Sequence, residues 1–199
     1  MKRLIAFAGC AFALGCFNEP EPAYKTVPEG SRVYLQDKAL KDLSSVKDAF
    51  KAGEAIDYVN LDRNSLEKLP AEIADLTGLK WLRLNRNRLS SLPDLSRLAK
   101  LRRIYLGDNR FTAVPETLKD LPCLTDIDLS GNPVREIPRW LAEKKGLEGL
   151  SFSRTLVEKL PEDLSAWKSL RQLQLGDLRL GRDEMERIRR ALPGTAVVF

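Results

Sequence analysis

The sequence predicts an α/β solenoid in which short parallel strands stack side by side over one continuous apolar core. Three observations lead to this fold class: six apolar segments recur at near-constant spacing, each contains a strand-like run, and a proline follows five of them at a fixed distance. The segments start, 22 or 23 residues apart, at Ile56, Leu79, Leu101, Leu124, Leu147 and Leu170. Such a recurrence is typical of repeat architectures, whose units bury their apolar faces only against one another.

One unit shows how the pattern makes structure. Residues 79–100 read LKWLRLNRNRLSSLPDLSRLAK, and within them Leu82-Arg83-Leu84 alternates between apolar and polar side chains. Such alternation favours a short strand with one buried face. The chain must then turn, and Asn87 can hydrogen-bond backbone groups of that turn. The first four units share this residue (Asn64, Asn87, Asn109 and Asn132), whereas the last two have Thr155 and Leu178.

The spacing L-x-x-L-x-L-x-x-N-x-L-x-x-L, followed by Pro93, resembles the leucine-rich repeat family. The L-P-x-x-L form of that family is matched at residues 69–73 (LPAEI) and 160–164 (LPEDL). The resemblance covers Ile56 to about Leu180 and implies a leucine-rich repeat solenoid with a short parallel sheet on its concave face, capped by a helix at each end. It also implies a binding role, but a fold does not name a partner.

The start of the chain predicts export. Residues 1–15 read as a signal peptide, with a basic start and an apolar run too short to span a bilayer. The stretch Ala13-Leu14-Gly15-Cys16 resembles the lipobox of bacterial lipoproteins, although Ala13 stands where that family most often has leucine. The resemblance implies cleavage before Cys16 and its acylation, which makes residues 16–30 an acylated cysteine and an extended tether. Ordinary secretion is the alternative, and Cys10 is a weaker lipidation site.

Phe17 follows the cysteine at the place where lipoproteins kept in the inner membrane carry aspartate. The resemblance therefore implies the bacterial cell envelope, with a lipid anchor and the outer membrane favoured.

The remaining segments predict caps at the two ends of the repeats, which span residues 56–180. In the N-terminal cap, residues 31–55, apolar residues at helical spacing end in Phe50, with Asp37 as N-cap and Gly53 as stop. Ser44-Ser45 could instead divide this stretch into two short helices, and residues 33–35 form a strand or loop. The C-terminal cap, residues 181–199, has a helix with Asp183 as N-cap and a last strand at residues 196–199.

Composition and motifs exclude most chemistry. The chain has no histidine, Gly-rich phosphate loop or cysteine cluster, so we expect no enzyme, cofactor or metal site. Asp126 and Asp128 read as a solvated pair, with a weak cation site as the minor alternative. The net charge of +5, or +3 after loss of the signal, predicts no nucleic-acid partner. We expect Cys123 to be a small buried residue and Lys144 to stand at a solvent-reaching turn.

The outward positions of the first three strands carry large aromatic and guanidinium groups, which are enriched at interface hot spots. Asp62, Arg63, Asn85 and Asp108 border them. The predicted partner-binding residues are Tyr58, Trp81, Arg83, Arg86, Arg103 and Tyr105. The alternative is that the arginines only stack on the rings and keep the sheet soluble.

The favoured function is a membrane-anchored, non-enzymatic leucine-rich repeat lipoprotein that binds a protein partner through its concave face. The alternative is a structural protein of the cell envelope that holds cell-wall polymer, with sugars on the aromatic rows. A bacterial effector resembling repeat-bearing ubiquitin ligases is a third reading, but those carry a separate catalytic domain for which this chain has no room.

Overall fold

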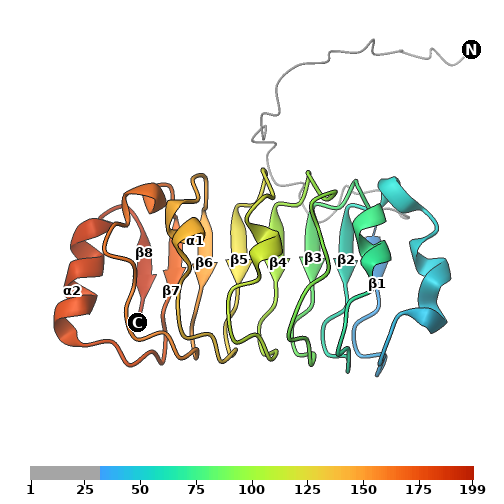
Figure 1. The fold of residues 1–199 in the computed structure, drawn as a ribbon, viewed down its shortest axis with the longest axis horizontal. Coiled ribbons are helices and arrows are strands. Elements are labelled where there is room, and N and C mark those ends of the chain that lie inside the picture. The colour runs from blue at the N-terminus through green and yellow to red at the C-terminus, as the bar shows by residue number, and fades with distance from the viewer. Residues whose placement is uncertain (1–31) are drawn as a thin grey trace, which may run out of the picture.

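A computed structural model describes residues 32–199 as one eight-stranded parallel sheet whose strands follow one another in chain order. Figure 1 shows the strands side by side, with a helical cap beyond each end of the row. The strands are β1 (Arg32–Tyr34), β2 (Tyr58–Asn60), β3 (Trp81–Arg83), β4 (Arg103–Tyr105), β5 (Asp126–Asp128), β6 (Gly149–Ser151), β7 (Gln172–Gln174) and β8 (Ala196–Val198). The predicted solenoid is confirmed, and each cap adds a strand to the six of the repeats.

The strands align so that equivalent positions of successive repeats are direct neighbours. Leu82 of β3 pairs with Ile104 of β4, which in turn pairs with Ile127 of β5. These middle residues are buried, as are the apolar residues that directly follow strands β2 to β7. The 22- or 23-residue period therefore becomes a translation along the sheet, because every repeat contributes the same layer to one core.

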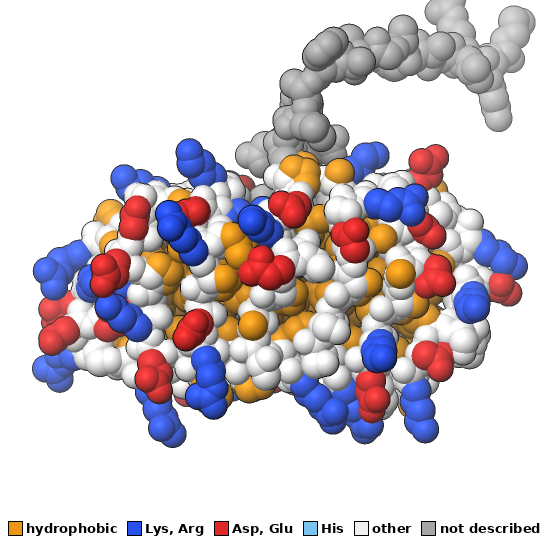
Figure 2. All heavy atoms as spheres, in the orientation of Figure 1, with side chains coloured by type: hydrophobic (Ala, Val, Ile, Leu, Met, Phe, Trp, Pro, Cys, Tyr) orange, Lys and Arg blue, Asp and Glu red, His pale blue; other side chains and the backbone are white. Residues whose placement is uncertain are grey.

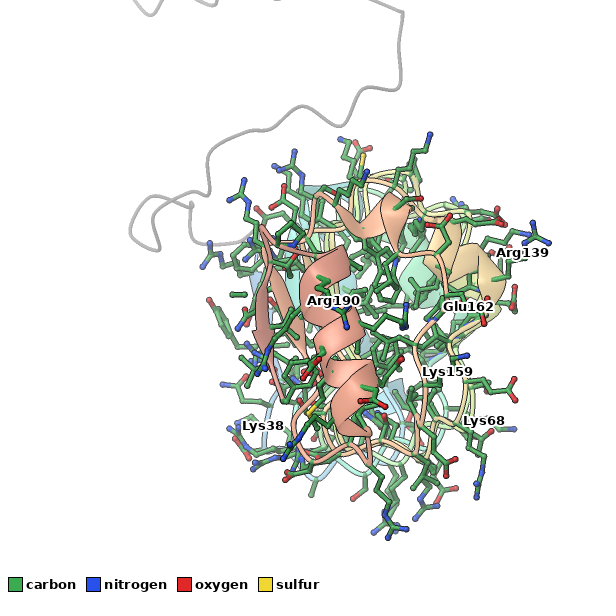
Figure 3. The ribbon with its side chains drawn as sticks, turned by 90° about the vertical axis from the view of Figure 1, so that its left-hand side faces the viewer. Lys38, Lys68, Arg139, Lys159, Glu162 and Arg190 are labelled. Atoms are coloured by element: carbon green, nitrogen blue, oxygen red, sulfur yellow. The ribbon has the colours of Figure 1, made fainter. Side chains whose placement is uncertain are left out.

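Short helical turns form the other wall of the core (Figure 3). They are η3 (Ala71–Asp75), η4 (Glu116–Leu118), α1 (Arg139–Glu143) and η5 (Ser165–Trp167). Three of them begin directly after Pro70, Pro115 and Pro138, whose fixed φ directs the chain into the turn. In the fifth repeat the turn ends in Trp167, which is fully buried and donates from Nε1 to the Leu141 carbonyl at 2.9 Å.

The predicted asparagine ladder is present in the first four repeats. Asn109 donates to the carbonyl of Leu106 in its own turn and to that of Leu84 in the preceding repeat, both at 2.9 Å. Its Oδ1 accepts from the backbone N–H of Leu89, also in the preceding repeat. Asn87, Asn109 and Asn132 thus satisfy buried backbone groups of two repeats at once, and Asn64 does the same for the first repeat and the N-terminal cap.

The N-terminal cap differs from the single α-helix that the apolar spacing predicted. It contains two 3₁₀ segments, η1 (Ser44–Phe50) and η2 (Gly53–Ala55). Ser44 and Ser45 begin the first of these segments, so they do not divide two helices as the alternative supposed. Asp37 is not an N-cap: it lies in a turn with φ of 59° and pairs with Arg63. Gly53 begins η2 instead of ending a helix. Leu40 and Leu43 are nevertheless buried against the first repeat.

The C-terminal cap consists of α2 (Arg182–Ala191) and β8. Gly181, and not Asp183, occupies the N-cap position, and Asp183 lies in the first turn. Ile188 is buried and Met185 packs on the core, as the spacing predicted. Arg187 pairs with Glu184 at 2.8 Å and donates to backbone carbonyls at residues 160–162, which ties the helix to the fifth repeat.

Two further expectations were wrong. The Lys144 ammonium does not reach for solvent but donates to the carbonyls of Lys119 and Leu121, both at 2.9 Å, and burial lowers the pKa of Lys144. Cys123 is partly exposed and disulfide-bonded. No other cysteine lies within residues 32–199.

The predicted signal peptide, Cys16 and the tether all fall in residues 1–31, outside the described part of the chain. Within residues 32–199, no helix is both long and apolar enough to cross a bilayer. The side that carries the helical turns shows acidic and basic side chains interspersed (Figure 2).

Candidate functional site

The candidate site is the outer sheet face, defined here as the first and third residues of each strand, whose side chains point away from the core. Side chains alternate along a strand, so these residues flank the buried middle residue on either side. In-register pairing arranges them in two rows across the sheet. The first row is Arg32, Tyr58, Trp81, Arg103, Asp126, Gly149, Gln172 and Ala196; the third-residue row is Tyr34, Asn60, Arg83, Tyr105, Asp128, Ser151, Gln174 and Val198.

The β1–β4 part of this face is a stack of rings and guanidinium groups. The Tyr58 ring lies 5.4 Å from the Tyr34 ring and 6.0 Å from that of Trp81, measured between centroids. The Arg103 guanidinium lies over the Trp81 ring at 4.8 Å. The register brings these groups together because strand neighbours are about 4.8 Å apart, close to the spacing of stacked groups.

Arg83 is held from two sides. Its guanidinium lies 5.2 Å from the centre of the Tyr105 ring, and its Nε donates to Asp62 Oδ2 at 2.8 Å. Asp62 was expected to point away from the core, but it is 3% exposed, and its Oδ1 accepts from the backbone N–H of Asn85. The carboxylate therefore has a structural role and fixes the direction of Arg83.

The six predicted binding residues differ in accessibility. Tyr58 is only 9% exposed because Tyr34 and Trp81 flank it, and this burial raises the pKa of its hydroxyl. Burial likewise raises the pKa of Tyr105. The remaining four are Trp81, Arg83 and Arg103, which are half-buried, and Arg86, which is exposed. Five of the six lie together on the outer sheet face, and Arg86 lies beside it.

Arg86 belongs to a row of turns along the sheet edge where the backbone is left-handed. Arg63, Arg86, Asp108, Gly131 and Arg154 have φ between 52° and 67° at equivalent positions. Arg86 and Arg154 both pair with Asp108, at 3.6 and 2.9 Å. The Arg154–Asp108 pair spans the repeat that contributes Gly131. The sequence did not predict this pair, because Arg154 and Asp108 are 46 residues apart.

The β5–β7 part of the face is hollowed where the β1–β4 part is filled. Gly149 of β6 has no side chain, and its neighbours are Asp126, Asp128, Gln172 and Gln174 on the flanking strands. A shallow cavity of about 170 Å³ lies over Gly149 and Ser151 and is bordered by those residues and Tyr105. The glycine at a position held by tyrosine, tryptophan and arginine in the first three repeats was the available signal.

Charge on this part of the face is acidic. Asp126 Oδ2 accepts from the Thr125 hydroxyl at 2.7 Å and lies 3.4 Å from Arg103 Nε. Asp128 Oδ1 accepts from the backbone N–H of Ser130 at 2.9 Å. Among residues 32–199, no three acidic or cysteine side chains gather in a group that could hold a metal ion.

Comparison with known proteins supports the fold. No family model matches the chain. It is 35% identical over 121 residues to a probable inactive kinase of Dictyostelium discoideum, roco10, covering 56% of this chain and 4% of that protein. It is 31% identical over 110 residues to rabbit (Oryctolagus cuniculus) lumican, covering 53% and 56% of the two chains. The chain thus spans well under two thirds of these relatives, and the match to the kinase-named protein covers only a small segment.

Among solved structures, an internalin of Listeria monocytogenes superposes with a TM-score of 0.61 at 21% identity, covering 84% of this chain and 54% of that one. A leucine-rich repeat protein of Leptospira interrogans matches with a TM-score of 0.40 at 23% identity, over 80% and 58% of the chains. The repeat pattern, the in-register parallel sheet and the internalin superposition together establish the fold as a leucine-rich repeat solenoid.

Proposed function

We propose that the protein is a non-enzymatic binding module that grips a protein partner with the β1–β4 part of its outer sheet face. The observation that carries this proposal is the interleaved stack of Tyr58, Trp81 and Arg103 beside that of Arg83 and Tyr105. Tryptophan, tyrosine and arginine are enriched among the few hot-spot residues that dominate the binding energy at protein interfaces.

The stack is preorganised for binding. Trp81 lies between Tyr58 and Arg103, and Arg83 is held by both Tyr105 and buried Asp62. Side chains ordered before association lose less conformational entropy when a partner arrives, and that cost otherwise opposes binding by about 0.5–1.5 kcal/mol per side chain. The contacts that hold the arginines on the rings therefore lower the entropy cost of binding a partner.

The ring contacts favour a protein over cell-wall polymer. A sugar ring stacks on an open aromatic face, but Arg103 covers one face of Trp81, and Arg83 covers one face of Tyr105. The stacked guanidinium groups also present N–H donors, which suit the backbone carbonyls and acidic side chains of a protein. Cell-wall polymer stays the second candidate, to be separated by experiment.

The proposal includes a lipid anchor on Cys16, which would hold the module at the bacterial envelope, with the outer membrane favoured. Several acyl chains anchor a protein firmly, since each buried methylene contributes about 0.8 kcal/mol. Acylation of the Cys16 thiol and a disulfide between Cys16 and Cys123 exclude each other. The mass of the non-reduced mature protein distinguishes them, and the Cys16→Ser variant should leave the membrane fraction if the anchor is correct.

The partner is tested by photo-crosslinking in intact cells through a reactive residue at position 86, whose side chain is exposed beside the stack. We expect a discrete protein adduct that disappears in the Trp81→Ala, Tyr105→Ala double variant. Trp140→Ala is the matched control, because Trp140 is a partly buried tryptophan on α1, among the helical turns.

The proposal fails if the adduct survives the double variant, or if isolated cell-wall sacculi retain the protein through Trp81 and Tyr105 while no protein adduct forms. Circular dichroism of each variant establishes that the solenoid is intact, so that loss of the adduct reports on the surface and not on folding.

A further inference from the structure

The hollow over β6 is a slot one strand wide, and it lies on the same face as the stack. Its floor is Gly149 and Ser151, the two smallest neighbouring residues on the outer sheet face. One wall is β5, with Asp126 and Asp128, and the other is β7, with Gln172 and Gln174. Since β5 and β7 are two strand spacings apart, roughly 9–10 Å separates the wall backbones, which leaves room for a flat group between the side chains.

The carboxylate of Asp126 leans over the floor. A Cβ atom placed on Gly149 would lie 2.5 Å from Asp126 Oδ1, so this oxygen occupies the space above the glycine. Its other oxygen, Oδ2, accepts from the Thr125 hydroxyl and pairs with Arg103. Both contacts fix the orientation of the carboxylate from outside the slot.

Asp128 supplies the charge of the slot. Its Oδ1 accepts from the Ser130 N–H, but it forms no ion pair with any lysine or arginine in the described part of the chain. Arg103 offsets the charge of Asp126, so the slot carries about one uncompensated negative charge. Gln172 and Gln174 add amide oxygens that accept hydrogen bonds, and the Tyr105 ring lies at one end.

We infer that this slot receives an arginine side chain of the partner protein, an inference that rests on the proposed function and adds the chemistry of one contact. A guanidinium is planar, carries five donors and no acceptor, and forms strong paired hydrogen bonds with carboxylates. The slot offers carboxylate and amide acceptors around a narrow floor and an excess negative charge. An acidic side chain would meet Asp128 at close range and is repelled.

The test uses the full-length protein, so that the Cys123 disulfide is kept, and N-acetyl-arginine amide as the probe. Titration is followed through the backbone amide signals of Gly149 and Ser151 in ¹⁵N NMR spectra. We expect saturable shifts in the millimolar range at these amides. N-acetyl-citrulline amide, which has nearly the same shape without the charge, and N-acetylglucosamine should leave both signals unmoved.

Two variants close the slot in different ways. Asp128→Asn keeps the shape and the Ser130 bond but removes the charge, and should weaken the arginine probe by about tenfold, the loss expected for one charged hydrogen bond. Gly149→Val fills the floor and pushes the Asp126 carboxylate aside, because the Cβ atom alone would lie 2.5 Å from Asp126 Oδ1, and it should abolish the shift at Ser151. Asp177→Asn is the control, because it removes an exposed aspartate at the sheet edge, in the turn after β7.

The inference is overturned if the shifts of Gly149 and Ser151 are equal for the arginine and citrulline probes, if the sugar shifts them instead, or if Asp128→Asn and Asp177→Asn behave alike. None of these outcomes touches the crosslinking result at position 86. Conversely, the slot could bind the arginine probe while the crosslinked adduct persists in the Trp81→Ala, Tyr105→Ala variant. That result would support the slot and contradict the proposed function.

Discussion

The first four repeats and the last two share one strand register, yet different groups hold their turns. Asn132 donates to the Leu129 carbonyl in its own repeat and to the Leu106 carbonyl in the preceding one, at 3.0 and 2.9 Å. Thr155, at the equivalent position, donates to the Phe152 carbonyl three residues earlier, and within residues 32–199 its side chain makes no hydrogen bond to the repeat before it. The ladder of side chains that joins repeats therefore ends at Asn132.

Other contacts replace the ladder in the C-terminal part. The Trp167 indole donates to the Leu141 carbonyl of the preceding repeat, and Arg187 of the cap donates to three carbonyls of the fifth repeat. The comparison teaches that the sheet register is propagated by backbone pairing and core packing. The polar groups that satisfy the turns can change from repeat to repeat, provided that buried backbone groups keep partners.

The largest effect on this difference between the repeats should come from removing the Trp167 contact, which replaces the asparagine ladder in the fifth repeat. Trp167→Ala should lower the free energy of unfolding by about 4 kcal/mol, because it leaves a large cavity and removes the bond to the Leu141 carbonyl. Urea denaturation measures the loss. Trp167→Leu, which introduces the residue type found at Leu76, Leu98 and Leu121, should recover part of it; an equal loss in both variants would contradict the packing explanation.

The ladder itself should show the next largest effect. Asn109→Ala leaves the Leu89 N–H and three carbonyls without their side-chain partner and should cost about 3 kcal/mol. Thr155→Val removes a bond confined to one repeat and should cost about 1 kcal/mol. Both values come from the same urea titrations, and comparable losses would show that the fifth repeat depends on its turn residue as much as the third does.

The left-handed edge offers a smaller and more specific test. A Cβ atom on Gly131 would collide with Asp108 Oδ1, which pairs there with Arg154. Gly131→Ala should therefore cost about 1–2 kcal/mol, from backbone strain and the displaced pair. The Asp108→Ala, Gly131→Ala double variant removes the collision, and a double-mutant cycle should give a non-additive result. Strict additivity would mean that backbone strain alone accounts for the loss.

The smallest effect depends on pH. The hydrogen bond from Arg187, followed by the Leu160 N–H, holds the pKa of Glu184 below its ordinary value of 4.5. A lowered carboxyl pKa adds stability that is fully present above pH 4.5 and is lost as the pH falls through the folded-state pKa. Glu184→Gln should remove less than about 1 kcal/mol of the stability that the protein loses on acidification. Asn109→Ala should leave that pH dependence unchanged. If the free energy of unfolding of Glu184→Gln depends on pH as it does in the unaltered protein, other carboxylates cause the acid sensitivity.

Much of the fold could be predicted from the residues alone. The outward positions at Tyr58, Trp81 and Arg103 align in the predicted register, and the asparagines make the predicted turn bonds. Periodicity succeeds here because each repeat meets the same neighbour in the same way, so local spacing carries the long-range contact. The caps were less predictable, since a 3₁₀ segment such as Ser44–Phe50 shares its apolar spacing with an α-helix.

The candidate site was predicted as a set of residues and not as an arrangement. Alternation places Tyr58 on the outer face, but the cap strand supplies Tyr34, which buries it. The sequence predicts that Asp62 is a surface charge, whereas in the structure it is buried and bonded to Arg83 and to the Asn85 backbone. Gly149 is visible in the sequence as an outward position without a side chain, but the slot also requires the side chains of the strands on either side, which the sequence does not place.

The sequence by itself determined the repeat period, the buried leucines, the strand order and the positions that face outward, because these follow from spacing within 23 residues. Only the tertiary structure decided which outward side chains remain accessible, which arginines lie on which rings, and where the sheet is hollow. Those properties depend on atoms brought together from different repeats, such as Asp108 and Arg154 across Gly131, and spacing along the chain does not encode them.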